Sequence, residues 1–216
     1  MALSRPARAA SGADAEDDDH LRTADFQRLS KLIGEQVGIR LPPGKRLMVE
    51  GRLRKRMRVR GFASFDDYCD SLFKGGGLDA ELPYLINAVT TNKTDFFREP
   101  EHFDFLEETI VPRLLAARGG ERKPLLKVWS AASSTGAEAF TTAMVLADLA
   151  HARGDFRFAI LGTDISTAVL AQAERAVYPA EMFAPVPPEK QTRYVMHARR
   201  QGDRLMLNFS IRDLGQ

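Results

Sequence analysis

Two short apolar runs constrain the fold of this chain more than any other feature. They are Leu125–Trp129 (LLKVW) and Phe158–Thr163 (FAILGT), and each has the length of a buried strand. The residues between them, about 137–153, have helical periodicity, and a further helix is expected over about 167–177. The order strand, helix, strand, helix predicts a βαβ unit whose strands run parallel in one sheet. The second part of the chain is therefore expected to be a Rossmann-like α/β domain.

The first part of the chain follows a different pattern, and residues 23–90 are predicted to form a small all-helical domain. Phe26, Leu29 and Ile33 recur at steps of three and four residues, which gives one apolar helix face, and Gly38 suits the end of that helix. Further helices of this domain are expected over about 45–60, from Ser64 to about residue 74, and over about 82–89. After the domain, a helix is expected over 101–118.

The two ends of the chain have other compositions. Residues 1–22 are small, polar and acidic, and they are predicted to form a disordered tail. Residues 180–214 contain several prolines and two strand-like pieces, 194–196 and 205–209, on either side of Gly202-Asp203. This pattern predicts a β-hairpin in a small antiparallel β-subdomain.

Composition argues against several classes of function. One cysteine allows no disulfide framework, and four scattered histidines give no metal-ligand spacing, so no metal site is expected. No apolar stretch reaches the length of a membrane span, so membrane insertion is not expected and a cytoplasmic location is. The net charge of +2 gives no reason to expect a nucleic-acid partner.

The loop after the first strand suits a nucleotide-like ligand. Residues 130–136 are small, which lets backbone N–H groups approach a ligand at the start of the following helix. Asp164, directly after the second strand, is placed to accept hydrogen bonds from ribose hydroxyls. The loop contains Gly136 alone and no GxGxxG, so a plain packing loop stays open as an alternative. Glu138 could equally be an acid that favours the helix dipole.

One segment is specific enough to suggest a family. Thr90–Glu99 (TTNKTDFFRE) closely resembles the TTNxTxFFRE signature of the chemotaxis receptor methyltransferases, the CheR family. Residues 128–144 resemble the cofactor loop of that family, residues 162–166 its acidic strand end, and residues 38–58 its helical-domain signature. The segments also occur in the family's order.

The resemblance implies S-adenosylmethionine-dependent O-methylation of glutamate side chains on the cytoplasmic helices of chemotaxis receptors, with S-adenosylhomocysteine as product. Carried over by position, it implies that the cofactor is bound by Asn92, Thr94, Arg98, Ala132, Glu138 and Asp164. Ala132 and Glu138 would contact the methionine part, Asp164 the ribose, and Arg98 would lie closest to the transferred methyl group. Structural alternatives are an ion pair of Arg98 with Glu99 or Glu101, and helix N-caps at Asn92 and Thr94.

The helix over 45–60 is strongly basic, and the resemblance implies that it meets acidic receptor helices. The residues expected to bind the partner are Arg52, Lys55, Arg56 and Arg58. Positive charge would steer an acidic partner and raise its association rate. A solvated basic face and RNA binding stay open as alternatives.

The sequence departs from the family pattern in two places. Ala139 and Phe140 replace the family's proline and tyrosine, and no CRNxxIYF motif is recognised near the end. Two parallel strands would leave sheet faces and edges uncovered, since such sheets usually have five or six strands. Residues 91–216 are therefore interpreted as a partial methyltransferase domain that is incomplete at its C-terminal end. The alternative function is a non-catalytic receptor-binding or regulatory protein derived from the family.

Overall fold

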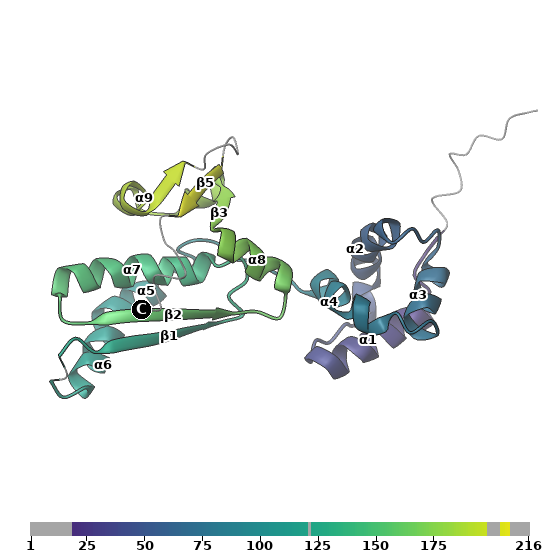
Figure 1. The fold of residues 1–216 in the computed structure, drawn as a ribbon, viewed down its shortest axis with the longest axis horizontal. Helices are drawn as coiled ribbons and strands as arrows, with labels where there is room; N and C mark the ends of the chain where they lie inside the picture. The colour runs from purple at the N-terminus through teal and green to yellow at the C-terminus, as the bar shows by residue number, and fades with distance from the viewer. Residues whose placement is uncertain (1–18, 121, 198–203, 208–216) are drawn as a thin grey trace, which may run out of the picture. The chain divides into compact units, whose positions relative to one another are not determined.

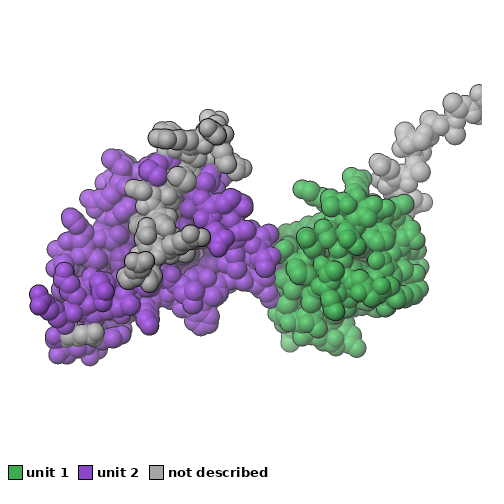
Figure 2. All heavy atoms as spheres, in the orientation of Figure 1, with its two compact units in different colours: residues 1–89 green, residues 90–216 purple. Residues whose placement is uncertain are grey.

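A computed structural model describes residues 19–120, 122–197 and 204–207 (Figure 1). The chain divides into two compact units, residues 1–89 and 90–216, which Figure 2 colours green and purple. Most of the predicted tail, residues 1–18, lies outside the described residues, and so does the predicted turn at Gly202-Asp203.

The first unit is all-helical, as the sequence predicted. Its elements are α1 (Thr23–Val37), the 3₁₀ turn η1 (Pro43–Lys45), α2 (Arg46–Val59), α3 (Phe65–Phe73) and α4 (Leu78–Val89). Both predicted helix ends are confirmed. Helix α1 ends at Gly38 in the left-handed conformation, and Ser64 Oγ accepts a hydrogen bond of 3.1 Å from the Asp67 amide at the start of α3.

The helical unit also includes residues 19–22, which the sequence had assigned to the tail. Leu21 is fully buried in the unit's core, and its carbonyl accepts a 2.7 Å hydrogen bond from Arg46. Asp19 accepts a 3.0 Å hydrogen bond from the Phe65 amide. The composition of residues 1–22 as a whole predicted disorder, but one apolar side chain and its polar neighbours are enough to hold the last four residues.

A buried carboxylate joins three helices of this unit. Glu81 of α4 accepts hydrogen bonds of 2.9 and 2.7 Å from Arg56 of α2 and one of 3.2 Å from the Tyr68 hydroxyl of α3. Hydrogen bonds from Arg56, its attractive charge and the hydroxyl together hold the pKa of Glu81 below its usual range despite burial. The guanidinium of Arg56 also lies 3.3 Å from the centre of the Tyr84 ring.

The second unit contains the predicted βαβ order, which confirms the α/β class. Its first elements are α5 (Glu101–Phe105), the π-helical turn η2 (Leu106–Ile110), α6 (Val111–Ala117), β1 (Leu125–Ala131), α7 (Ala137–Arg153), β2 (Arg157–Thr163) and α8 (Thr167–Arg175). Strands β1 and β2 run parallel, from the pair Leu125 and Arg157 to the pair Ala131 and Thr163.

One predicted helix differs in detail. The sequence predicted regular helix over 101–118, but the structure has a π turn in its middle. Pro112 follows this turn, and proline has no N–H to donate and clashes with the carbonyl four residues earlier. The wider turn avoids that clash, and such turns are frequent at functional sites.

The β1–β2 sheet is covered on one face by the described residues. Leu126 and Val128 of β1 pack with Val111 of α6 and Leu146 of α7. On the opposite face, Trp129 is 69% exposed and its register partner Leu161 is 62% exposed. The sequence analysis expected two parallel strands to leave a sheet face uncovered, and these two exposed side chains agree with that expectation.

A small antiparallel sheet follows α8, and its hairpin was predicted. The elements are β3 (Val177–Pro179), the 3₁₀ turn η3 (Ala180–Phe183), α9 (Pro188–Tyr194), β4 (Val195–His197) and β5 (Arg204–Leu207), with strand order β3-β5-β4. The hairpin pair β4–β5 is confirmed. The subdomain begins three residues earlier than residue 180, because Ala176 takes the left-handed conformation and ends α8 before β3.

Aromatic packing and an ion-pair cluster fix this subdomain to the rest of the second unit. Phe96 stacks on Phe183 with ring centres 4.8 Å apart and meets Tyr178 edge-on at 5.1 Å. Asp148 of α7 accepts hydrogen bonds from three side chains of α9, which are Lys190, Arg193 and Tyr194.

Candidate functional site

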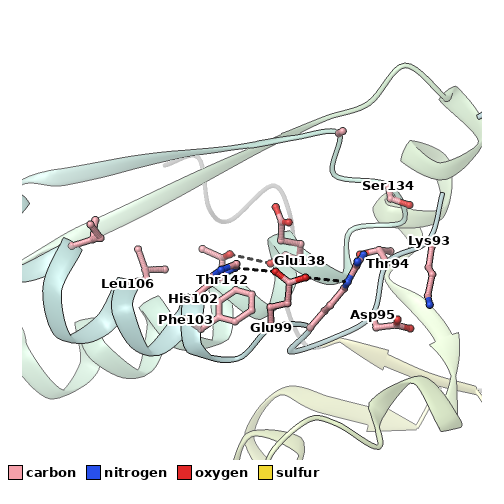
Figure 3. A pocket seen from close by; sticks show the side chains of 13 residues that line it. Lys93, Thr94, Asp95, Glu99, His102, Phe103, Leu106, Ser134, Glu138 and Thr142 are labelled. Carbon is pink, nitrogen blue, oxygen red and sulfur yellow. Dashed lines mark hydrogen bonds and ion pairs between the residues drawn. The ribbon is translucent and has the colours of Figure 1, made fainter. Parts of the chain in front are cut away.

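The second unit contains a pocket of about 560 Å³, shown in Figure 3. Its walls come from the segment before α5, from the α5–η2 helix, and from the β1–α7 loop with the first turns of α7. The lining residues are Lys93, Thr94, Asp95, Arg98, Glu99, His102, Phe103, Leu106, Ile110, Ala132, Ser134, Glu138 and Thr142. The volume lies in the usual range of small-molecule sites.

Four of the six residues predicted to bind the cofactor line this pocket, namely Thr94, Arg98, Ala132 and Glu138. Asn92 and Asp164 do not line it, and both instead hold Ser134, which does. The Ser134 hydroxyl donates to the Asn92 carbonyl at 3.1 Å, and the Ser134 amide donates to Asp164 Oδ2 at 2.9 Å. The structure thus brings the six predicted residues together. Four of them line the pocket, and Asn92 and Asp164 contact the lining residue Ser134.

The β1–α7 loop is strained and tightly held. Ala132 and Ser134 have φ angles of 57° and 52°, in the left-handed region that non-glycine residues rarely adopt. Besides the contacts of Ser134, the Ser133 amide donates to the Thr163 carbonyl at 2.9 Å. Strained backbone persists where its surroundings fix it, and it clusters at functional sites.

The signature segment, Thr90–Glu99, is an irregular loop in which some side chains enter the core and others line the pocket. Phe96 is fully buried, whereas Arg98 lines the pocket with its side chain 55% exposed. The Phe97 amide donates to Thr141 Oγ1 of α7 at 3.1 Å. The suggestion that Asn92 and Thr94 cap a helix is wrong, because α5 begins only at Glu101.

Opposite charges lie on the pocket wall. Arg98 Nε is 3.9 Å from Glu99 Oε1, and Glu99 Oε2 is 3.4 Å from His102 Nδ1. The ion pair with Glu99 that the sequence suggested for Arg98 is therefore present, but such exposed pairs are weak and leave the guanidinium able to bind an anion. Glu138 Oε1 accepts a 2.7 Å hydrogen bond from Ser130 Oγ. A cation and a carboxylate in one pocket suit the two charged ends of an amino acid.

Several lining residues were not predicted as site residues. Leu106 and Ile110 lie within the helix predicted over 101–118, but they mark the two ends of the π turn and line the pocket. His102 and Thr142 gave no signal of their own. The sequence could have indicated them only because His102 lies close to the segment Thr90–Glu99 along the chain and Thr142 lies close to Glu138.

Within residues 19–120, 122–197 and 204–207, no group of three or more histidine, cysteine, aspartate or glutamate side chains could hold a metal ion. None of the helices in these ranges is long and apolar enough to cross a membrane.

Comparison with known proteins decides the family. A model of the CheR methyltransferase all-alpha domain matches residues 24–90, and a model of the CheR methyltransferase SAM binding domain matches residues 92–213. The chain belongs to the CheR methyltransferase family. The resemblance seen in the sequence is confirmed, and so is the division into a helical and an α/β part.

Curated relatives of this family are chemotaxis protein methyltransferases. The protein of Borreliella burgdorferi is 37% identical over 79% of this chain and 60% of its own length. That of Escherichia coli is 39% identical over 82% of this chain and 58% of its own. Chemotaxis protein methyltransferase 2 of Pseudomonas aeruginosa is 35% identical, with 82% and 60% covered. The chain thus spans about 60% of the length of these CheR relatives.

Proposed function

We propose that this chain acts as an S-adenosylmethionine-dependent protein-glutamate O-methyltransferase on chemotaxis receptors. The observation that carries the proposal is the convergence of Thr94, Arg98, Ala132 and Glu138 on one pocket in a chain of the CheR family. Receptor glutamates on cytoplasmic helices are the proposed substrate, and the cytoplasm is the proposed location.

The pocket fits S-adenosylmethionine in size and in donor chemistry. The guanidinium of Arg98 would bind the methionine carboxylate, and the carboxylate of Glu138 would bind the methionine ammonium. Asp164 accepts backbone N–H groups from Ser134 and Ser166, one on each oxygen. A carboxylate has about four acceptor positions, so Asp164 can still accept from ribose hydroxyls as the sequence suggested.

The proposed reaction requires alignment more than proton transfer. A glutamate side chain is ionised at neutral pH. Its oxygen would form a bond to the sulfonium methyl group as the carbon–sulfur bond breaks, which yields a methyl ester and S-adenosylhomocysteine without any proton moving. The residues of the chain therefore have to orient the two reactants and exclude water. In this scheme Arg98 would lie nearest to the transferred methyl group.

The helical unit offers a surface for an acidic receptor helix, although it differs from the predicted one. Lys55 and Arg58 of α2 are exposed. Arg52 is exposed too, and its guanidinium donates to the Ala88 carbonyl at 3.0 Å. The predicted partner surface also included Arg56, which we leave out because its guanidinium is bound within the unit by Glu81. The proposed partner surface is therefore Arg52, Lys55 and Arg58.

Two apolar side chains favour binding over a merely solvated basic face. Leu47 and Val59 of α2 are 66% and 70% exposed, and with Lys55 they are spaced by multiples of four residues along the helix. At about 3.6 residues per turn, this spacing spreads the three side chains over about a third of the helix circumference. An exposed stripe with apolar and cationic side chains suits an amphipathic acidic helix better than it suits water or RNA.

Titration of S-adenosylhomocysteine into the purified chain tests the proposal. Isothermal calorimetry should show saturable binding with a dissociation constant in the micromolar range. Glu138→Gln, which keeps the shape and removes the charge, should weaken binding roughly tenfold or more, since hydrogen bonds to charged groups are worth about 1.5–3 kcal/mol. Glu189→Gln on the exposed surface of α9 is the matched control and should bind like the wild type.

Transfer to receptors needs a separate measurement. With a receptor cytoplasmic fragment and radiolabelled S-adenosylmethionine, the chain should form base-labile methyl esters, and Lys55→Glu with Arg58→Glu should slow their formation. An absence of cofactor binding together with retained receptor binding would overturn the proposal and favour the non-catalytic receptor-binding function.

A further inference from the structure

Tyr178 connects the β-subdomain to the loop that forms one wall of the pocket. It lies on β3, is fully buried, and its hydroxyl donates a 2.6 Å hydrogen bond to the carbonyl of Thr135 in the β1–α7 loop. Burial raises the pKa of Tyr178, so the hydroxyl stays protonated and remains a donor at neutral and mildly alkaline pH.

The same side chain contacts the other wall. Its ring meets Phe96 edge-on, with the ring centres 5.1 Å apart, and Phe96 stands between Thr94 and Arg98 in the signature segment. It also meets Phe140 of α7 at 6.3 Å. Tyr178 therefore touches two of the three segments that supply the predicted cofactor residues, although it lies outside the pocket itself.

The loop that Tyr178 holds needs such support. Ala132 and Ser134 are in the left-handed conformation, which other backbone states would relieve. Asp164 and Asn92 hold the loop through Ser134, next to the pocket. The Tyr178 hydroxyl supplies a contact at the following residue, Thr135, from the β-subdomain.

We propose that Tyr178 is a positioning residue that keeps the β1–α7 loop in the conformation that binds S-adenosylmethionine and S-adenosylhomocysteine. This inference rests on the proposed function of the pocket. Without the hydrogen bond, the strained loop spends time in other conformations. The apparent dissociation constant then rises by the inverse of the fraction of molecules that remain competent.

Tyr178→Phe tests the inference because it removes one oxygen atom and keeps the ring packing. The S-adenosylhomocysteine dissociation constant measured by calorimetry should rise roughly threefold to tenfold, the range expected for one neutral hydrogen bond. Tyr68→Phe is the matched control. Tyr68 is equally buried and donates to Glu81 at 3.2 Å in the helical unit, so its loss should leave cofactor affinity unchanged.

Hydrogen exchange gives a readout that does not depend on the ligand. In the unliganded Tyr178→Phe protein, the Ser133 and Ser134 amides should exchange several-fold faster, while amides of the helical unit keep their rates. In Tyr68→Phe, amides of the helical unit should exchange faster, while the Ser133 and Ser134 amides keep their rates. A merely structural role of Tyr178 would lower protection throughout the second unit rather than in the loop.

A donor-restoring variant covers the case in which Tyr178→Phe does not fold. With 4-aminophenylalanine at position 178, an N–H donor returns to nearly the same place, and affinity should come within about twofold of the wild type. Wild-type affinity and loop exchange in Tyr178→Phe would overturn the inference, and so would a folded aminophenylalanine protein that binds as weakly as Tyr178→Phe. If the wild type binds no S-adenosylhomocysteine, the proposed function fails, and loop exchange still tests whether Tyr178 holds the loop.

Discussion

The two units of this chain are stabilised in different ways. The helical unit has one continuous core that runs from Leu21 to Val89, and its buried carboxylate Glu81 has several partners. The described part of the second unit has two separate apolar clusters, one around Phe96 and one around Leu126, and an open sheet face. The segments of the first unit share one apolar core, whereas the described segments of the second are joined by two smaller clusters.

The largest effect is expected at the joint between the pocket and the β-subdomain. Phe96→Ala should destabilise the second unit by about 4 kcal/mol, as is usual for a buried phenylalanine, and abolish S-adenosylhomocysteine binding. Denaturant unfolding and calorimetry measure both. Phe65→Ala in the helical unit is equally buried and should leave binding intact. Loss of binding in Phe65→Ala would contradict the separation of roles.

Substitutions of the glycines at the two ends of α7 distinguish the cost of backbone strain from the cost of steric crowding. Gly136 and Gly154 have φ angles of 92° and 71°, but an added Cβ at Gly136 would lie 3.0 Å from Ala173 Cβ and from the Phe140 ring, whereas at Gly154 it meets nothing within 4 Å. Gly154→Ala should cost about 1 kcal/mol from strain alone. Gly136→Ala should cost about 3 kcal/mol, because crowding adds to the strain. If denaturant unfolding gave the same loss of unfolding free energy for both variants, the side chains around Gly136 would be able to move aside at no cost.

The buried carboxylate predicts a pH dependence for the helical unit. Because Arg56 holds the pKa of Glu81 below its ordinary value of 4.5, ionised Glu81 stabilises the fold fully above pH 4.5. That stabilisation is lost as the pH falls through the lower folded-state pKa. Glu81→Gln should therefore cost about 2 kcal/mol at pH 7 and progressively less below pH 4.5.

Urea unfolding at several pH values, followed through the amide signals of α2, measures this difference. The exposed pair of Lys74 and Asp70 supplies the control, and Asp70→Asn should leave the unfolding midpoint at pH 7 unchanged. A cost of Glu81→Gln that does not vary with pH would contradict the assignment.

The smallest effect is expected where α9 meets α7. Burial alone would raise the pKa of Asp148, but hydrogen bonds from Lys190 and Tyr194 lower it below its usual range. Asp148→Asn should cost about 1 kcal/mol and speed hydrogen exchange in α9 and β4. Asp155→Asn, in an exposed pair with Arg153, should change neither. Unchanged exchange in α9 would show that the aromatic cluster alone holds the subdomain.

Local patterns predicted most of the fold. Helix faces, Gly38, Ser64, the βαβ order and the hairpin depend on residues close in sequence, and the structure confirms them. Residues 19–22 were missed because they are held by α2 and α3, which lie far along the chain. The wider turn before Pro112 was missed although its cause, the proline, is local in sequence.

The site shows the same limit. Resemblance indicated Thr94, Arg98, Ala132 and Glu138, which line the pocket, because each lies in a recognisable motif. That Asn92 and Asp164 both hold Ser134 could not be read from spacing, since it depends on how three distant segments meet. The same holds for Arg56, whose burial against Glu81 depends on the packing of α2 against α4.

The open face of the β1–β2 sheet contains the chain's single tryptophan. The Trp129 indole N–H donates to Thr163 Oγ1 at 2.9 Å, so the ring has a fixed place on that face. Indole fluorescence shifts to shorter wavelengths when water is excluded, and parallel sheets are normally covered on both sides. The emission of Trp129 is therefore a label-free optical signal for any polypeptide that comes to cover this face.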